Sequence, residues 1–186
     1  MLVCDSHNFM FIHIQRTGGT SIREMCHKLS LKTYEKEFFH GHVNLLEDFD
    51  ILNKYKTFAF VRNPWDRVLS WYKLLTKDVA KDKKFSFEDY ILNFEEFNNA
   101  KIHSFRPCQY DYIYKDKKKC IDYIGKFENY EKDLKDIFSK FGISIDSIPN
   151  INGTDHKKYQ EYYTPKMAKH IEEICHKDIE EFGYKF

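Results

Sequence analysis

Short apolar runs that lead into amphipathic stretches recur along the chain. Residues 9–14, Phe-Met-Phe-Ile-His-Ile, form an apolar, partly β-branched run that a Gly-Gly turn ends, which predicts a buried strand. Apolar residues then recur at helical spacing up to Leu29, and Thr20 or Ser21 is placed to cap that helix. The pattern therefore predicts a strand, a glycine turn and a helix in succession.

A second strand and helix are expected within residues 57–75. Residues 58–61 are apolar and predict a buried strand, Asn63 is placed as a helix N-cap, and Pro64 suits the first helical position. The apolar face of this helix would consist of Val68, Leu69, Tyr72 and Leu75.

Later segments continue the same alternation. We expect a helix capped by Ser86, a strand within 120–128, a helix over 130–141 and a last helix from Thr164 to the residue before Gly183. Strands followed by helices predict an α/β fold, with a mostly parallel central sheet flanked by helices. Such a sheet binds its ligand at the carboxyl ends of the strands.

Composition narrows the class of protein and its partners. The length, 186 residues, suits a single domain over residues 1–186. Because 30 Lys and Arg residues balance 29 Asp and Glu residues, no bulk field would hold nucleic acid or an anionic membrane. Five scattered cysteines without a CxxC pair indicate neither a disulfide framework nor a zinc site. No apolar run approaches the roughly 18 residues of a membrane span, and no signal peptide precedes the first strand. We therefore expect a cytoplasmic protein without a metal, and its oligomeric state is not indicated.

The first strand-to-helix turn has the composition of an anion site. Gly18 and Gly19 permit positive φ and a close backbone approach, so that successive N–H groups can converge on an anion at the start of the helix. Further charge and hydroxyl donors would come from Arg16, Thr17, Thr20 and Ser21. An ordinary tight turn with a capped helix explains the same residues, and this stretch alone leaves both interpretations open.

A nucleotide kinase is a weaker interpretation of this turn. Its loop requires G-x-x-x-x-G-K-[ST], whereas here the two glycines are adjacent and no lysine follows them. The strand at 58–61 leads to Arg62 and not to an acidic residue suited to magnesium. Arg62 stands at the end of this strand, and Ser70 lies eight residues later, about two turns into the next helix. This pair suits a second phosphate instead. Two anion-binding strand ends suggest a ligand with phosphates at both ends.

The segments "FIHIQRTGGTSI" and "VRNPWDRVLSWY" together resemble the sulfotransferases that use 3′-phosphoadenosine 5′-phosphosulfate (PAPS). The resemblance implies that Arg62 and Ser70 bind the 3′-phosphate and that the first loop binds the 5′-phosphosulfate. The loop residues in that role are Gln15, Arg16, Thr17, Gly18, Gly19, Thr20 and Ser21. "IGKFENYEKDL" and the last 25 residues also resemble carbohydrate sulfotransferases, so the likeness touches most of the chain.

The segment "FHGHV", residues 39–43, resembles the H-G-H-V of the heparan and uronyl 2-O-sulfotransferase branch. The resemblance implies that His42 is the general base. Histidine suits that role because its unperturbed pKa, ~6.5, lies near the working pH. If the segment is extended, His40 points to the same side as His42 and would orient the acceptor or the base. A surface or core histidine is the alternative for each.

The family likeness implies a reaction as well as a set of binding residues. An acceptor hydroxyl, on a carbohydrate, would attack sulfur in line, and 3′,5′-bisphosphoadenosine (PAP) would leave without help from a metal. Arg16 and the N–H groups of residues 17–20 would stabilise charge on the departing phosphate. However, Gln15-Arg16 stands where the family usually has Pro-Lys, and arginine lacks the compact ammonium. A nucleotide-binding protein that has lost transfer is therefore the alternative function, ahead of a small nucleotide kinase.

Other polar or aromatic residues have simpler explanations. Lys157 and Lys158 lie in a polar segment that would either close over the 3′-phosphate or remain a solvated loop. His13, within the apolar run, is expected to be a core histidine, and Arg67 a structural ion-pair partner. Trp65 and Trp71 are expected to pack in the interior, with contact between Trp65 and the nucleotide as the alternative.

Overall fold

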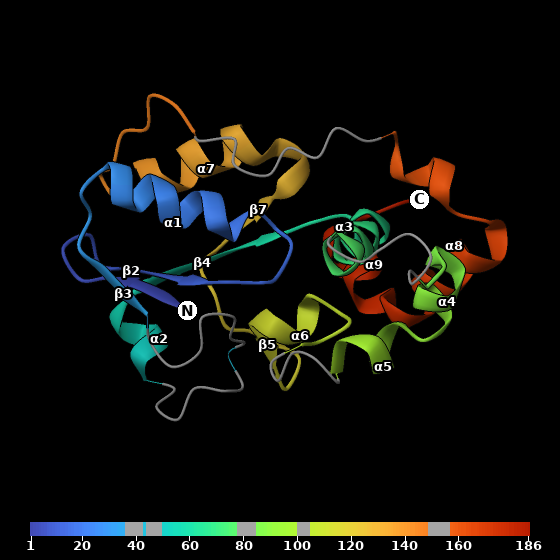
Figure 1. Ribbon diagram of the computed structural model, residues 1–186. Coiled ribbons are helices and arrows are strands. Elements are labelled where there is room, and N and C mark those ends of the chain that lie inside the picture. Colours follow the sequence, from blue (N-terminus) through green and yellow to red (C-terminus); the bar gives the residue numbers. More distant parts are fainter. Residues whose placement is uncertain (36–42, 44–49, 78–84, 100–104, 149–156) are drawn as a thin grey trace. The chain divides into compact units, whose positions relative to one another are not determined.

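The computed structural model describes residues 1–35, 43, 50–77, 85–99, 105–148 and 157–186 (Figure 1). The chain divides into two compact units, which are described in turn. The first unit consists of Met1–Arg62 and Asp111–Thr154, and the second of Asn63–Tyr110 and Asp155–Phe186. A single domain over residues 1–186 stays a prediction.

A five-stranded sheet forms the centre of the first unit. Its strand order is β3-β1-β2-β4-β7, with parallel pairing of β2 to β4 and of β4 to β7. Strand β1 is antiparallel to both β2 and β3, so it alone runs against the other four strands. The expected mostly parallel sheet of an α/β fold is therefore confirmed. The strands are β1 (Leu2–Cys4), β2 (Phe9–Ile12), β3 (Thr33–Glu35), β4 (Lys56–Val61) and β7 (Tyr123–Lys126).

Helices α1 (Gly19–Lys28) and α7 (Tyr130–Ser139) cover one face of this sheet (Figure 1). Alternate side chains of the strands meet the apolar faces of both helices in one buried cluster, because successive strand residues point to opposite faces. Phenylalanine rings fill its centre: Phe9, Phe11, Phe58, Phe60 and Phe138. Strand residues of the other face, such as Met10 and Ala59, are also buried, which is usual for parallel strands.

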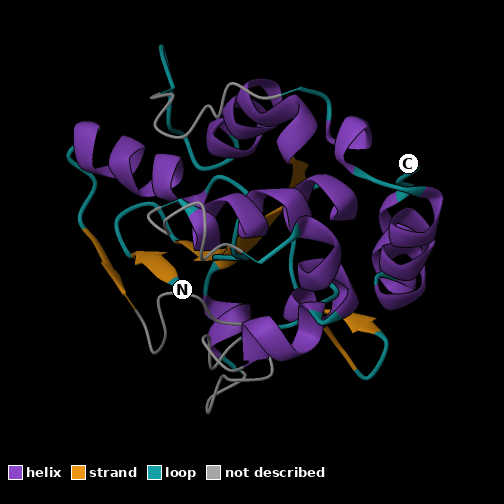
Figure 2. Ribbon diagram, turned by 45° about the vertical axis from the view of Figure 1, so that its right-hand side comes forward, coloured by secondary structure: helices purple, strands orange, loops and turns teal. Residues whose placement is uncertain are grey.

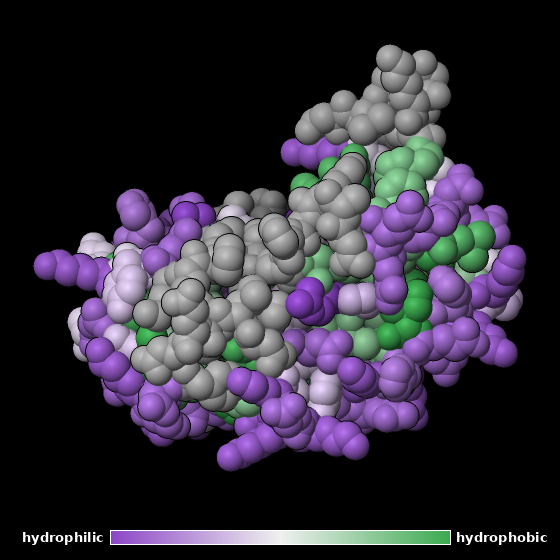
Figure 3. Space-filling view, turned by 90° about the horizontal axis from the view of Figure 1, so that it is seen from below, coloured by the Kyte–Doolittle hydropathy of each residue, from purple (hydrophilic) through white to green (hydrophobic). Residues whose placement is uncertain are grey.

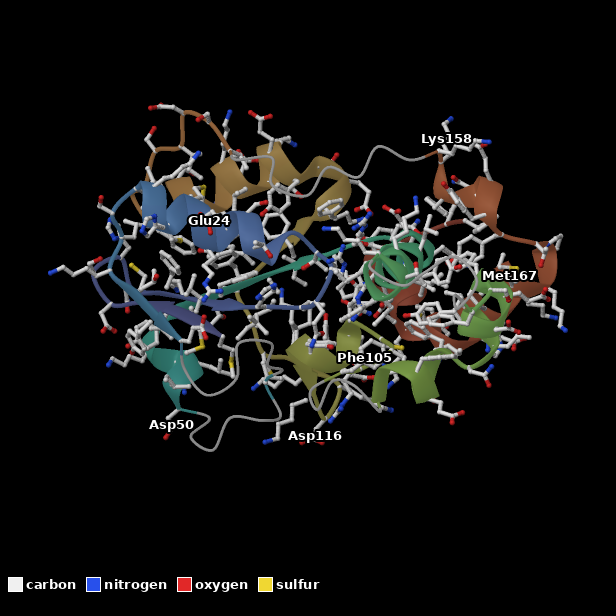
Figure 4. The ribbon with its side chains drawn as sticks, in the orientation of Figure 1. Glu24, Asp50, Phe105, Asp116, Lys158 and Met167 are labelled. Atoms are coloured by element: carbon white, nitrogen blue, oxygen red, sulfur yellow. The ribbon has the colours of Figure 1, made fainter. Side chains whose placement is uncertain are left out.

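Short elements complete the first unit. They are α2 (Ile51–Lys54), α6 (Tyr110–Ile113), the 3₁₀ turn η3 (Phe127–Asn129) and the hairpin of β5 (Tyr114–Lys115) with β6 (Lys118–Lys119). The hairpin turns at Asp116 and Lys117, both of which have positive φ. Figure 4 labels Asp116 at this turn.

The described part of the second unit is helical (Figure 2). Its elements are α3 (Pro64–Thr76), α4 (Phe87–Leu92), α5 (Phe94–Asn99), η4 (Tyr159–Tyr162), α8 (Pro165–Ile174) and α9 (His176–Phe182). Helix α3 begins as predicted: the Asn63 side chain accepts hydrogen bonds from the N–H groups of Trp65 and Asp66, and Pro64 occupies the first turn. Ser86 caps α4 in a capping box, also as predicted.

Two boundary predictions are wrong. The N-cap of α1 is Gly18, in a left-handed conformation without a side-chain cap, and not Thr20 or Ser21. The single last helix is in fact α8 and α9, because at Cys175 the backbone leaves helical dihedrals (φ −101°, ψ 23°). A kink at one residue preserves the apolar periodicity on either side, so periodicity alone could not reveal it.

Hydrophilic side chains cover much of the molecular face drawn in Figure 3, with smaller hydrophobic areas between them. Among the described residues, no helix has the length and apolar character required to cross a membrane.

Candidate functional site

The loop between β2 and α1 alternates the sign of its backbone φ angles. Arg16 has φ 66° and Gly18 has φ 90°, whereas Thr17 between them is outside the positive-φ region. Alternation between left-handed and right-handed conformations turns successive N–H groups toward one side of the backbone. Such a concave set of donors, often called a nest, binds anions.

The carbonyl groups of the loop are held by donors from the protein. Thr17 Oγ1 donates to the Ile14 carbonyl (2.8 Å), Arg62 Nη1 to the Arg16 carbonyl (3.3 Å) and the Tyr130 hydroxyl to the Gly18 carbonyl (2.6 Å). In a planar trans peptide the C=O and the next N–H point in opposite directions. The N–H groups of residues 17 and 19 are therefore turned away from Arg62 and Tyr130.

Helix α1 adds its own donors to this loop. The first N–H groups of any α-helix have no acceptor within the helix, and the aligned peptide dipoles make this end positive. Gly18, the N-cap, has no side chain with which to accept from them. The end of α1 thus favours an external anion.

Close packing inside the protein requires both glycines. A Cβ at Gly18 would lie 2.5 Å from the Tyr130 ring, and a Cβ at Gly19 would lie 2.0 Å from His13 Nε2. The His13 side chain is buried and stacks on Phe11, with ring centroids 5.3 Å apart, which confirms the prediction of a core histidine. The glycines therefore have a packing role, which their place in a turn does not reveal.

The loop side chains fall into two groups. Gln15, Thr17 and Ser21 are buried, and Thr17 makes the inward bond to Ile14 noted above. Burial raises the pKa of Tyr130, and a hydrogen bond with Ser21 opposes this shift in part. Thr20 is exposed and Arg16 half-buried. Arg16 and Thr20 are thus the loop side chains nearest to solvent.

Tyr112 is a loop contact that sequence reasoning missed. Its fully buried hydroxyl donates to Oε1 of Gln15 across 97 positions of sequence. Tyr112 belongs to α6, a helix of four residues in which no periodic pattern can develop.

Arg62 lies at the end of β4, beside the loop. Because β2 and β4 pair in parallel, their carboxyl ends meet at the same edge of the sheet. The guanidinium carbon of Arg62 also lies over the Phe127 ring, 4.2 Å from its centroid, a distance suited to a cation–π contact. The structure therefore brings Arg62 and Arg16 together at one edge.

The other predicted binding residues belong to the second unit. Ser70 is buried in α3, whereas Lys157 is exposed and lies 3.6 Å from Glu161 in an ion pair between surface side chains. Trp65 and Trp71 are buried, as expected for packing residues, and Trp65 Nε1 donates to the Ala168 carbonyl (2.9 Å).

Arg67 has a structural role that includes hydrogen bonds to backbone carbonyls. The side chain is buried and donates to the carbonyls of Pro107 (2.8 Å) and Arg106 (3.4 Å). Its guanidinium carbon lies 5.7 Å from the centroid of Phe105, which Figure 4 labels. Arg67 thus holds the segment that precedes α6.

Comparison with known proteins decides the family. Residues 1–185 match the model of the sulfotransferase family. The chain belongs to this family. Among solved structures, mouse sulfotransferase SULT7A1, in complex with PAP, is 11% identical and has the same fold, with a TM-score of 0.59 over 95% of this chain and 86% of the mouse chain.

Two further proteins are similar to this chain. A sulfotransferase from Alicyclobacillus acidocaldarius is 16% identical, with a TM-score of 0.46 over 95% of this chain and 98% of that one. An uncharacterized protein of Archaeoglobus fulgidus is 28% identical over 110 residues, which is 59% of this chain and 87% of the relative.

The two histidines predicted for chemistry in this sulfotransferase, His40 and His42, lie outside the described residues. Among the residues that the structure does describe, no group of three or more His, Cys, Asp or Glu side chains is arranged to hold a metal ion.

Proposed function

We propose that this protein transfers the sulfuryl group of PAPS to an acceptor hydroxyl and releases PAP. The observation that carries the proposal is the alternating φ of Arg16, Thr17 and Gly18 at the start of α1, with Arg62 at the end of the neighbouring parallel strand. Family membership supports sulfuryl transfer. The solved mouse sulfotransferase of the same fold contains PAP, which supports PAPS as the donor.

The 5′-phosphosulfate would bind in the loop. Backbone N–H groups of residues 17–20 are fixed before the ligand arrives, so they stabilise charge on the bridging oxygen without reorganisation. The half-buried Arg16 would add a positive charge there. The inward-facing side chains of Gln15, Thr17 and Ser21 would support the loop from behind, while Thr20 is exposed beside the same helix end.

The 3′-phosphate would bind to Arg62 and Ser70, with Lys157 closing over it. Arg62 Nη1 donates to the Arg16 carbonyl, and the guanidinium carbon lies 4.2 Å from the centroid of the Phe127 ring. A flat, oriented fork suits a bidentate contact with phosphate.

His42 would remove the proton from the acceptor hydroxyl, with His40 orienting the acceptor or the base. The resemblance of "FHGHV" to the 2-O-sulfotransferase branch supports this role and a carbohydrate acceptor. A positioned general base contributes about 10²–10⁴-fold to the rate.

The test is PAP release from PAPS in the presence of mixed glycan acceptors. We expect His42→Ala to lower kcat by about 10²–10⁴-fold. Replacement of the exposed His176, on α9, by Ala provides the matched control and should leave kcat unchanged. The proposal fails if the natural chain releases no more PAP than the His42→Ala variant does.

Binding without turnover is the second candidate function, and Arg16 is the observation that favours it. Arginine stands where the family usually has lysine, and it has a left-handed backbone conformation. If this candidate is correct, Arg16→Lys should create PAP release in a protein that already binds PAP. An active natural chain whose rate Arg16→Lys leaves unchanged would exclude it.

A further inference from the structure

Two tyrosine hydroxyls contact the loop near its two ends, and Tyr112 is fully buried whereas Tyr130 is partly buried. Tyr112, in α6, donates to Oε1 of Gln15, and Tyr130, the first residue of α7, donates to the Gly18 carbonyl (2.6 Å). Both tyrosines belong to the first unit and come from elements about 100 residues after the loop. Only Arg16 and Thr17 lie between the two anchored positions.

The anchored stretch has a conformation that its own residues do not prefer. Arg16 has φ 66°, a left-handed conformation that residues with a Cβ rarely adopt. Glycine would reach it without strain, but arginine reaches it only where surrounding contacts over-determine the backbone. Such contacts are present at Gln15, at Gly18 and, through Arg62, at the Arg16 carbonyl. The Gly18 carbonyl also accepts from the Ser21 N–H (3.0 Å), so Tyr130 adds to a bond of the helix itself.

Gln15 also lacks a restraint that the family pattern usually has. Proline at this position fixes its own φ and restricts the residue before it, whereas glutamine does neither. Gln15 is nevertheless almost fully buried, with its side-chain oxygen held by Tyr112. The Tyr112 hydrogen bond therefore restrains Gln15 through its side chain, where proline would act through its ring.

We propose that Tyr112 and Tyr130 are positioning residues for the donor nucleotide. They act through Gln15 and Gly18, and they keep the N–H groups of residues 17 and 19 aimed at the 5′-phosphosulfate. The inference rests on the proposed function and adds a mechanism by which this chain tolerates the departure from Pro-Lys.

The test is the affinity of the full chain for PAP, measured by isothermal titration calorimetry. Tyr112→Phe removes only the hydroxyl and should weaken PAP binding about 2- to 13-fold, the equivalent of one hydrogen bond. Tyr130→Phe should weaken it similarly, since the ring that covers Gly18 remains.

Tyr55→Phe is the matched control. The Tyr55 hydroxyl is also buried and donates to a side chain, Asp5. Tyr55 precedes β4, whereas Arg62 follows it, and the six residues of β4 span about 20 Å. Tyr55→Phe should therefore lower the melting temperature of the free protein without changing its affinity for PAP.

Gln15→Met removes the acceptor of the same bond and provides a second route should Tyr112→Phe fail to fold. The double variant Tyr112→Phe with Gln15→Met should bind PAP no more weakly than the weaker single variant, because both remove one contact.

The outcomes separate this inference from the proposed function. If the natural chain does not bind PAP, the proposed function fails. If the natural chain binds PAP but Tyr112→Phe binds it equally well, or Tyr55→Phe loses as much affinity, the positioning role is wrong.

Discussion

Arg62 donates a hydrogen bond from Nη1 to the backbone carbonyl of Arg16, at 3.3 Å. The bond joins the carboxyl ends of two neighbouring parallel strands, β2 and β4, through the residues that follow them. Arg62 therefore supports the loop peptide at residues 16 and 17 in addition to any contact with a ligand. A change at this position should affect both halves of a nucleotide with two phosphate groups.

Arg62→Ala should weaken PAP binding by about 10- to 150-fold, the range for hydrogen bonds to charged groups. Arg62→Lys should recover only part of this loss, because an ammonium lacks the planar fork that can contact Phe127, the Arg16 carbonyl and a phosphate together. Calorimetric titration of PAP checks that affinity falls from the natural chain to the Lys variant and again to the Ala variant. Equal affinity of the Lys variant and the natural chain would contradict the role of the planar fork.

Gly19→Ala should destabilise the protein by about 1–3 kcal/mol through overpacking alone. The new Cβ would lie 2.0 Å from His13 Nε2, and the buried His13 ring is stacked on Phe11. Adding His13→Ala should recover much of the loss, since it removes the ring that the methyl group meets. Urea unfolding of the three variants and the natural chain measures this coupling.

Gly142→Ala separates steric crowding from backbone strain. Gly142 has φ 72°, and a Cβ at this position would meet no neighbouring atom within 4 Å, so alanine there causes strain without crowding. We expect a loss of about 1 kcal/mol that His13→Ala does not change. Additive losses for Gly19→Ala and His13→Ala would show that crowding against His13 is not the cause.

Local chemistry explains which parts of the fold are predictable. The start of α3 is predictable to the residue, because Asn63 and Pro64 suffice to specify an N-cap and a first turn. The start of α1 is not, because Gly18 takes its left-handed conformation under the Tyr130 ring, which is 112 residues away in sequence. Two of the donors to the loop carbonyls, Arg62 and Tyr130, are also distant in sequence, so the glycines indicate a turn without revealing which way its peptides face.

The break between α8 and α9 has the same kind of cause. Asp178, near the start of α9, accepts hydrogen bonds from the N–H groups of Gln109 and Tyr110 and from the Gln109 side chain. Such contacts join segments almost 70 residues apart, and periodicity within one segment contains no sign of them. Of the predicted site, the loop and Arg62 lie together in the first unit, while the roles of all the site residues stay predictions.

The stability of the protein should depend on pH through Asp178. Burial raises the pKa of this carboxyl above its ordinary value of 3.8, despite its three hydrogen bonds. The folded state therefore binds the proton more tightly than the unfolded state does. This contribution to the free energy of unfolding is fully present below pH 3.8 and is lost as the pH rises through the folded-state pKa.

Asp178→Asn should remove that part of the pH dependence. Asparagine has one acceptor oxygen, whereas the Asp178 carboxyl offers two oxygens to the donors of Gln109 and Tyr110. The variant should therefore be less stable by about 1–3 kcal/mol. In urea unfolding experiments, the difference in the free energy of unfolding between the variant and the natural chain should narrow as the pH rises from 4 to 7. This range begins near the ordinary carboxyl pKa of about 4. The exposed Asp136→Asn is the reference, and parallel curves for Asp178→Asn and the natural chain would contradict the raised pKa.

Cys120 should be the one fast-reacting thiol among the five cysteines of the native chain. The other four are buried, and Cys120, beside the β5–β6 hairpin, is half-buried. Burial raises the pKa of Cys26 to about 12, and a hydrogen bond with Cys108, followed by burial, raises the pKa of Cys175. Since the thiolate is the nucleophile, these groups should react with an aromatic disulfide only after unfolding.

The fast phase of this reaction at pH 8 should have the amplitude of one thiol. It should vanish in Cys120→Ser, whose slow phases should remain. A fast phase that persists in Cys120→Ser would mean that one of the buried thiols opens to solvent in the native state.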